Sequence, residues 1–414
     1  SWGVAWPLIA GKEGDWYPAG LKEKDFRGLY GYKVFLAIAV FLGDGLYNLV
    51  KIGWVSGKAM ADKAGDLFEL AADILLTARL DDRDRFRQMV LESRAGLEAG
   101  IVGAGHRFAA RRLDAPRSVA GWAGEAMGGL AYLDYIRALA KRVETDWEGV
   151  KVDLEAIRAA VLSRQGAVIN ATADGKTLDL AAPHLASFLA SLPGGAAAGS
   201  SASSCDWAAA AAGVANTSLA LTVPTQVNYV GKAANLYEDG GYELSGSAYV
   251  ASKVLGTSWL WDRVRVSGGA YGGFSDFDTH SGMFTFLSYR DPNLLDTLDV
   301  YDGTAGFLRG LELDSDALTK AVIGTIGDID GYQLPDAKGY TALMRHILGV
   351  TTEERQIRRD QVLGTTLADV RAFGDAVACV ASDAARVVAV TSAERAEAAM
   401  KARPGVFDEV VKVL

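Results

Sequence analysis

Two side chains with complementary chemistry lie six residues apart in the sequence. Arg265 carries a guanidinium with five N–H donors in a fixed fork, and Tyr271 carries a phenolic hydroxyl. Between them, Gly268 and Gly269 can adopt backbone angles that are closed to other residues, which allows a tight bend and a close approach to a ligand. Donors of these two kinds, held together, can bind a peptide carbonyl as it becomes an oxyanion. The four residues therefore indicate a substrate-binding site, with the glycines as candidate backbone contacts.

A second arginine is an alternative to Arg265 in this role. Arg263 lies two residues earlier, and in an extended backbone side chains two apart share one face. Alternation therefore cannot choose between the two arginines. A purely structural interpretation also stays open, in which the arginine pairs with a carboxylate and the tyrosine packs on a strand.

No metal-ligating motif accompanies the pair. A catalytic zinc site needs three protein ligands in register, and a His-x-x-Glu-His or His-Glu-x-x-His helix supplies two of them. Neither motif occurs in the sequence, and the histidines and cysteines are far apart: His106, His184, His280, His346, Cys205 and Cys379. The residues predict that this chain alone holds no catalytic zinc.

Glycine, serine and aspartate clusters match no complete motif. The glycines fit neither phosphate-binding pattern, the serines lack a Gly-x-Ser-x-Gly elbow, and the aspartate pairs complete no calcium loop. We therefore expect ordinary turn and loop roles for Gly272, Gly273, Ser267, Ser275, Ser281, His280, Asp276, Asp278, Asp328 and Asp330.

The composition limits the classes of function. The 414 residues have room for two or three domains, and 50% hydrophobic residues are enough for a buried core. A net charge of −9 argues against nonspecific nucleic-acid binding, which relies on basic side chains, and is compatible with basic peptides as ligands.

An almost uninterrupted apolar run occupies residues 34–50. Its 17 residues are at the lower limit for a helix that crosses a bilayer, and Asp44 near the middle would be costly in lipid. The run predicts an apolar helix, either buried in globular protein or forming a single membrane span within residues 30–53.

The sequence patterns around Arg265 and Tyr271 and along the rest of the chain predict an α+β fold. Strands are expected over 165–172, 220–230, 271–277, 282–288 and 385–390, and helices over 58–80, 246–261, 294–308, 315–327, 337–348 and 366–378. Residues 194–213, rich in Ala, Gly and Ser, are typical of a linker. This order favours two layered domains, each with helices on one face of a mainly antiparallel sheet.

From about residue 55 to the end, the sequence resembles the C-terminal half of pitrilysin/insulinase-type zinc metallopeptidases of the presequence-protease group. The similarity rests on the runs from Trp261 to Gly282 and from Ser288 to Leu295, and on Gly105-His-Arg-Phe, Gly121-Trp-Ala-Gly-Glu and Gln333-Leu-Pro-Asp-Ala-Lys-Gly. It implies an incomplete third domain over 55–193, the linker 194–213 and a fourth domain over 214–414.

The same resemblance implies roles for the candidate residues. Arg265 and Tyr271 correspond to the Arg and Tyr that reach across a closed chamber to the zinc site of the other half, so the resemblance favours Arg265 over Arg263. Zinc is the cofactor of the intact family and would be held by the N-terminal half, not by this chain. Gly268 and Gly269 would lie against the substrate.

Residues 1–54 resemble a segment of plant metal-nicotianamine transporters of the oligopeptide family. Trp6-Pro-Leu-Ile, Gly14-Asp-Trp-Tyr-Pro and Gly43-Asp-Gly-Leu-Tyr-Asn carry this similarity. One segment cannot form a transport path, so the resemblance implies a fusion in the gene or in its gene model rather than transport.

The resemblance implies a function for the longer part of the chain. It would be half of a zinc metalloendopeptidase of the mitochondrial matrix or chloroplast stroma that degrades unfolded peptides such as cleaved targeting presequences. The partners implied are an unfolded peptide and a separate N-terminal half. Two alternatives stay open: a catalytically silent peptide-binding or interaction half, and a fragment anchored in a membrane through residues 30–53.

Overall fold

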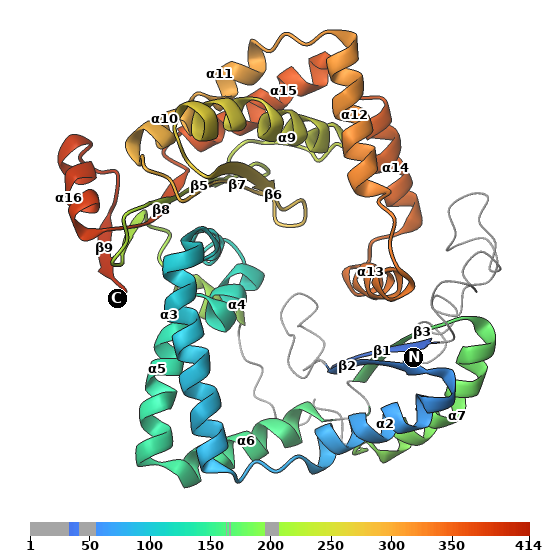
Figure 1. Cartoon of the computed structure of the whole chain (residues 1–414). Coiled ribbons are helices and arrows are strands. Elements are labelled where there is room, and N and C mark those ends of the chain that lie inside the picture. The colour runs from blue at the N-terminus through green and yellow to red at the C-terminus, as the bar shows by residue number, and fades with distance from the viewer. Residues whose placement is uncertain (1–32, 41–54, 163, 165–166, 195–206) are drawn as a thin grey trace. The chain divides into compact units, whose positions relative to one another are not determined.

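The computed structural model describes residues 33–40, 55–162, 164, 167–194 and 207–414 (Figure 1). They form two compact units, each assembled from segments that are distant in sequence. The first unit comprises residues 1–86, 142–205 and 332–351, and the second comprises 87–141, 206–331 and 352–414. Most of the predicted linker and most of the transporter-like segment lie outside the described residues.

The first unit is built on a three-stranded antiparallel sheet in the order β2-β1-β3. Its strands are β1 (Lys33–Val40), β2 (Val55–Met60) and β3 (Ala167–Thr172), and its helices include α2 (Ala64–Ala72), α6 (Trp147–Val161), α7 (Gly175–Ser191) and α13 (Pro335–Leu348). Helices α2 and α7 meet through Phe68 and Phe188, whose ring centres are 5.9 Å apart.

The predicted apolar helix over residues 34–50 is wrong where the structure describes it. Residues 33–40 form the central strand β1, paired with β2 through Ala37↔Ser56 and with β3 through Ala37↔Asn170. A short apolar run suits a buried strand as well as a buried helix, so periodicity alone could not separate them. Residues 41–50 lie outside the described residues, and no described helix is long and apolar enough to cross a membrane.

The helix expected over residues 58–80 is shorter than predicted. Residues 58–60 complete strand β2, and helical structure begins with η2 (Ala61–Lys63), continues through α2 and ends with η3 (Asp73–Thr77). Helix α13 packs on β3 of the same sheet, where the Asn170 side-chain amide donates to the Gly339 carbonyl at 2.9 Å. A side chain at Gly339 would collide with Thr172, so this close approach requires glycine.

The second unit contains a six-stranded mixed sheet in the order β6-β7-β5-β8-β4-β9. The pairs β6–β7, β7–β5 and β5–β8 are antiparallel, whereas β8–β4 and β4–β9 are parallel. The strands are β4 (Leu219–Thr222), β5 (Tyr229–Asn235), β6 (Gly272–Phe277), β7 (Met283–Tyr289), β8 (Arg386–Thr391) and β9 (Glu409–Lys412). The predicted hairpin of 271–277 and 282–288 is confirmed.

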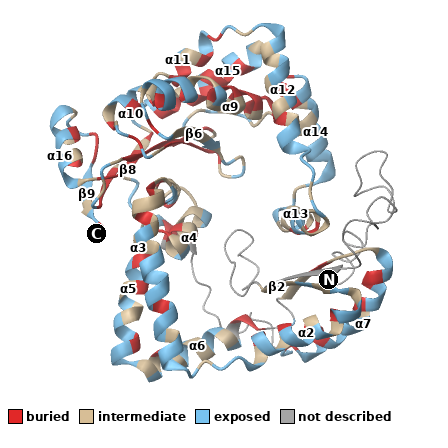
Figure 2. Cartoon of the chain, in the orientation of Figure 1, coloured by how far each residue is buried: buried red, intermediate tan, exposed pale blue. Residues whose placement is uncertain are grey.

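Helices cover both faces of this sheet, one face more than the sequence predicted (Figure 1). On one face, α9 (Ser247–Thr257), α10 (Leu295–Asp302), α11 (Thr304–Arg309) and α15 (Leu367–Val377) enclose the larger core. On the other face, the sheet packs on α3 (Arg83–Asp114) and α5 (Leu130–Thr145). Figure 2 shows the central strands mostly in red, in agreement with their burial on both sides.

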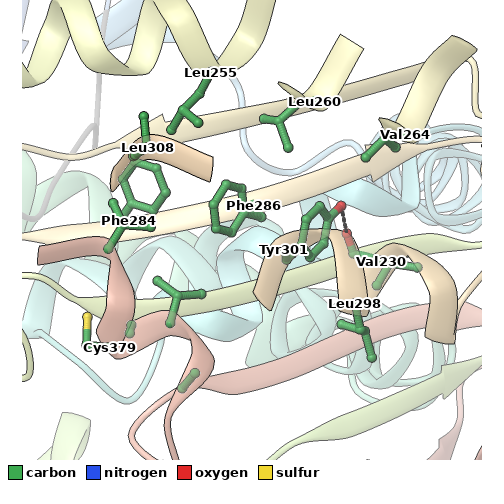
Figure 3. Packing of buried hydrophobic residues seen from close by; sticks show 14 of the residues in the cluster. Val230, Leu255, Leu260, Val264, Phe284, Phe286, Leu298, Tyr301, Leu308 and Cys379 are labelled. Carbon is green, nitrogen blue, oxygen red and sulfur yellow. Dashed lines mark hydrogen bonds between the residues drawn. The ribbon is translucent and has the colours of Figure 1, made fainter. Parts of the chain in front are cut away.

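Aromatic packing fixes the larger core. Phe286 of β7 stacks on Tyr301 of α10 with ring centres 4.9 Å apart, and the Tyr301 hydroxyl donates to the Val230 carbonyl of β5 at 3.2 Å (Figure 3). Phe284, on the same face of β7, lies edge-to-face with Phe286 at 5.0 Å. These contacts tie α10 to two central strands, and β7 in turn holds β6.

The remaining helices of the second unit are α4 (Val119–Gly128), α8 (Trp207–Ala212), α12 (Ser315–Ile329), α14 (Thr352–Leu363) and α16 (Ala393–Ala402), with the short turns η4 (Trp261–Ser267) and η5 (Ala378–Ala381). The helix expected over residues 294–308 is divided between α10 and α11 at Gly303. The strand expected over residues 220–230 is two strands, because Pro224 between them has no N–H for a sheet ladder.

Candidate active site

The predicted site residues lie on a helical turn and the start of an edge strand. After α9, residues Trp261–Ser267 form η4, a π-helical turn, and β6 begins five residues later at Gly272. The extended backbone assumed for the arginines is therefore wrong. Side chains two apart on a helix point in nearly opposite directions, so this turn separates Arg263 from Arg265 where a strand would not.

Arg265 lies close to two aromatic rings. Its guanidinium carbon is 4.0 Å from the ring centre of Trp261 and 6.0 Å from that of Tyr271. Trp261 precedes Arg265 by four residues, the spacing at which side chains on a helix are neighbours. A guanidinium held over a ring keeps its N–H donors at its edge, where they remain available to a ligand. The structure thus brings Arg265 and Tyr271 together.

Arg263 belongs to a different set of contacts. Its guanidinium carbon lies 5.2 Å from the ring centre of Trp259. Trp259 is itself fixed, because it stacks on Phe307 at 4.8 Å and its indole N–H donates to the Val300 carbonyl at 3.0 Å. This geometry gives Arg263 a packing partner and associates Arg265, not Arg263, with Tyr271.

The glycine pair makes the turn between η4 and β6. Gly269 has a φ of +78°, which favours glycine, and its N–H donates to the Arg265 carbonyl at 3.0 Å. A Cβ at Gly268 would lie 2.6 Å from the Val264 carbonyl oxygen. The Gly268 carbonyl already accepts from the Asn293 side chain at 2.6 Å. These contacts give both glycines a structural role, and their predicted contact with substrate stays a prediction.

Tyr271 stands at the exposed end of an aromatic row. Its side chain is exposed, at 68% for the residue, while its N–H donates to the Tyr289 carbonyl at 3.1 Å. The Tyr271 ring meets the Tyr289 ring edge-on at 5.6 Å, and Tyr289 meets His106 of α3 at 5.0 Å. Burial lowers the pKa of His106, and the neighbouring Arg107 adds to the effect. These ring contacts pack against one side of Tyr271, and most of its side chain stays exposed to solvent.

Hydrogen bonds of Asp291 and Asn293 form a corner after β7 that holds the other side of the Gly268–Gly269 turn. Asp291 is fully buried, accepts from the Asn293 N–H at 2.9 Å and accepts from the Thr297 hydroxyl at 2.7 Å. Burial raises the pKa of the Asp291 carboxyl, and these hydrogen bonds oppose that shift. Asn293 then binds Gly268, so the corner connects the start of α10 to the turn beside Arg265.

The serine and histidine near the hairpin turn make turn contacts. The Asp278 carboxylate accepts from the His280 N–H at 3.0 Å and from the Ser281 hydroxyl at 2.5 Å. Asp328 pairs with Lys253 at 2.9 Å, and Asp330 pairs with Arg359. Among the described residues, no three His, Cys, Asp or Glu side chains gather into a group that could hold a metal ion.

Sequence reasoning missed the supporting residues of the site. Trp261 opens the run that was singled out but was given no role, and its four-residue spacing to Arg265 was a usable signal once that turn was helical. His106 and Tyr289 carried no such signal, because more than 180 residues of sequence separate two rings that meet only in the folded unit.

Comparison with known proteins agrees with this arrangement. Residues 218–393 match the PreP C-terminal domain, and residues 47–139 match a family described as associated with subfamily C of the M16 peptidases. The chain is 52% identical over 360 residues to presequence protease 1, chloroplastic/mitochondrial, of Arabidopsis thaliana, a match that covers 87% of this chain and 32% of that protein. The chain spans about a third of the length of the curated relatives it matches first.

A second group of relatives matches only a short part. A probable metal-nicotianamine transporter of Oryza sativa subsp. japonica is 67% identical over 52 residues, which are 13% of this chain and 8% of the transporter. The similarity to transporters is therefore partial.

Solved structures share the fold at low sequence identity. A peptidase M16 inactive domain from Pseudomonas fluorescens superimposes with a TM-score of 0.57 at 16% identity, covering 87% of this chain and 93% of that one. Pitrilysin superimposes with a TM-score of 0.54 at 12% identity, covering 86% of this chain and 40% of its own. The sequence matches show that most of this chain corresponds to the C-terminal half of a presequence protease, and the solved structures show that it shares the fold of M16 peptidases.

Proposed function

We propose that this chain acts as the non-metal half of an organellar endopeptidase that degrades unfolded peptides, and that Arg265 and Tyr271 bind the substrate carbonyl during cleavage. The observation that carries the proposal is the position of the Arg265 guanidinium close to Trp261 and the exposed Tyr271. Two hydrogen-bond donors of this kind, one charged, can stabilise negative charge that develops on a carbonyl oxygen.

The donor groups of Arg265 and Tyr271 determine which part of the reaction this chain could perform. A fork of N–H donors and a hydroxyl can orient a peptide and stabilise an oxyanion, but neither group can activate water at neutral pH. The metal ligands and the general base are therefore expected on an N-terminal half, which would be the obligate partner. The name of the Arabidopsis relative supports a chloroplast or mitochondrion as the compartment and a presequence as the substrate class. Residues 55–193 and 214–414 would be the third and fourth domains of the assembled enzyme.

Reconstitution tests this proposal. The purified chain is mixed or co-expressed with the N-terminal half of a presequence protease, and cleavage of an unstructured fluorogenic peptide is followed. We expect chelator-sensitive cleavage from the mixture and none from this chain alone. Chelator-sensitive cleavage by this chain alone, abolished by Arg265→Ala, would overturn the division of labour, because dependence on Arg265 excludes a contaminating protease.

A catalytically silent peptide-binding half is the second candidate. It is supported by a fold shared with a domain described as inactive. Peptide binding without cleavage in the reconstituted mixture would select this alternative.

A further inference from the structure

Strand β6 is the terminal strand of the six-stranded sheet, and its outer edge has no partner strand in the part of the chain that the structure describes (Figure 1). The register shows which of its backbone groups face outward. Asp278 donates its N–H to the Met283 carbonyl at 2.9 Å, so the hydrogen-bonded pairs of the β6–β7 ladder include Asp276↔Thr285 and Phe274↔Leu287.

The other residues of β6 turn their N–H and C=O groups away from β7. Because bonding sides alternate along an antiparallel strand, the outward-facing residues are Gly273, Ser275 and Phe277. Strand β7 obeys the same alternation on its other side, where the Gly282 carbonyl accepts the N–H of Leu236 next to β5. The outer edge of β6 therefore presents the N–H and C=O groups of Gly273 and Ser275 and the C=O group of Phe277, whose N–H donates to the Asp276 carboxylate.

This edge lacks most of the features that block an added strand. Edge strands are protected by short length, charged side chains (lysine above all), proline or a bulge, and β6 carries one charged residue, Asp276. The opposite edge, β9, is four residues long and has Glu409 and Lys412 at its ends. Strand β6 has six residues, Gly-Gly-Phe-Ser-Asp-Phe, with regular pairing to β7 and neither proline nor lysine.

The surroundings of the edge point to one kind of occupant. At its beginning, Tyr271 and Arg265 offer donors for a peptide carbonyl, and Gly272 has only ordinary contacts at 3.8 Å or more around its would-be Cβ. At its other end, Asp276 and Asp278 lie near Asp114 of α3, and within the described residues none of the three carboxylates pairs with Lys or Arg. Their mutual repulsion, after the larger effect of burial, raises the pKa of Asp114 to about 7. A cation between these carboxylates would relieve the repulsion.

We infer that the outer edge of β6 binds an extended peptide segment as an added strand, with a basic side chain of that peptide beside Asp276. Main-chain hydrogen bonds would supply the affinity, and the carboxylates would supply a preference for Lys or Arg at one position. Such a strand would run directly onto Arg265 and Tyr271. The inference rests on the proposed function only in taking an unfolded peptide as the ligand, and it requires no cleavage.

Binding to the full 414-residue chain tests the inference. The probe is a fluorescein-labelled, unstructured 10-residue peptide with one central lysine, read by fluorescence anisotropy; the length is about that of one edge strand plus flanking residues. Ser275→Pro removes an outward N–H that takes no part in the β7 ladder, and Ser275→Ala keeps it. We expect the proline variant to weaken binding about tenfold or more and the alanine variant to bind within about twofold of the parent chain.

A second pair of probes keeps the test independent of how the variant folds. Methylation of alternate backbone nitrogens of the peptide removes the donors of one edge only, so one of two complementary methylated peptides should lose binding to the unmodified chain. Replacing the peptide lysine with norleucine should weaken binding to the parent chain but not to Asp276→Asn. Arg265→Ala removes the proposed carbonyl donor but leaves the edge of β6 intact, so this variant should still bind the two methylated peptides with different affinities. A failure of the proposed function and a failure of strand addition therefore give different results.

Three outcomes would overturn the inference. One is equal binding of the two methylated peptides. Another is unchanged binding by a folded Ser275→Pro variant. The third is sedimentation showing a dimer of the parent chain that Ser275→Pro dissociates, since the occupant of the edge would then be a second copy of this chain.

Discussion

The guanidinium carbon of Arg265 lies 4.0 Å from the ring centre of Trp261, on the same helical turn and four residues away. This contact fixes a long, flexible side chain beside an exposed tyrosine. It also distinguishes Arg265 from Arg263, which lies over Trp259 instead. The helical backbone of η4 is the physical reason that two arginines two residues apart have separate surroundings.

Removing the Trp261 ring should loosen Arg265 without removing its charge. A cation–π contact contributes about 0.5–2 kcal/mol, so we expect Trp261→Ala to lower kcat of the reconstituted enzyme by about 2- to 30-fold, with a smaller effect on KM. Trp261→Phe should restore most of the loss because it keeps a ring face. Val266→Ala, at an exposed position of the same turn, is the control and should leave kcat unchanged. Equal kcat for Trp261→Ala and the parent chain would show that the ring does not position Arg265.

The glycine turn should tolerate no side chain at either position. Gly269→Ala would place a Cβ at a φ of +78°, which costs about 1–2 kcal/mol of unfolding free energy. Gly268→Ala should cost more, because its Cβ would lie 2.6 Å from the Val264 carbonyl oxygen.

Gly256→Ala, in α9, is the matched control for these glycine variants. A Cβ there meets nothing within 4 Å, so alanine should stabilise the unit by up to about 1 kcal/mol. Denaturant unfolding measures all three variants, and a neutral Gly268→Ala would contradict the geometry of the turn.

The acidic end of the hairpin predicts a pH dependence. The pKa of Asp114 is raised to about 7 from its ordinary value of 3.8, chiefly by burial and then by the charges of Asp278 and Asp276. A carboxyl with a raised pKa in the fold favours the protonated, folded state at low pH, and that stability is lost as the pH rises from about 4 to about 7.

Asp114→Asn should therefore stabilise the second unit at pH 8 more than at pH 5. The gain should be about 1–4 kcal/mol, the upper value corresponding to about 1.4 kcal/mol for each unit of pKa shift. Unfolding free energies at the two pH values measure it, with the exposed Asp383→Asn as the control. The same gain at both pH values would contradict a half-buried Asp114 that is repelled by Asp276 and Asp278.

The pairing of β1 with both β2 and β3 predicts that residues 33–40 stabilise the sheet of the first unit. A chain that begins at residue 53 lacks β1, which pairs with both β2 and β3, so hydrogen exchange in those two strands should become faster. A chain that begins at residue 33 keeps β1 and should retain their protection. Equal exchange in the two truncated chains would show that β1 contributes nothing to this sheet.

Much of the second unit was predictable from the sequence, and the reasons are local. The hairpin of β6 and β7 follows from alternating side chains around turn residues, and both of its strands are found where they were expected. Pro224 and Gly303 divided a predicted strand and a predicted helix, respectively, and both residue types are known signals for such breaks.

What could not be predicted depends on distant partners. The apolar residues 33–40 suit a helix or a strand equally well, and pairing with β2 and with the distant β3 favours the strand. Likewise, in the row from Tyr271 through Tyr289 to His106, no local pattern connects Tyr289 of β7 with His106 of α3. The Arg–Tyr pair is indicated by its donor chemistry and by the family resemblance, and the structure adds the ring contacts that distinguish the two arginines.

The most direct test of the central claim is kcat of the reconstituted enzyme for three variants, Arg265→Ala, Arg263→Ala and Tyr271→Phe. Removing one donor to a developing oxyanion costs on the order of 10²–10³ in kcat, so Arg265→Ala and Tyr271→Phe should each fall by that factor. Arg263→Ala, which loses only its contact with Trp259, should stay within about tenfold of the parent enzyme. A larger loss for Arg263→Ala than for Arg265→Ala, or unchanged kcat for Tyr271→Phe, would contradict the account.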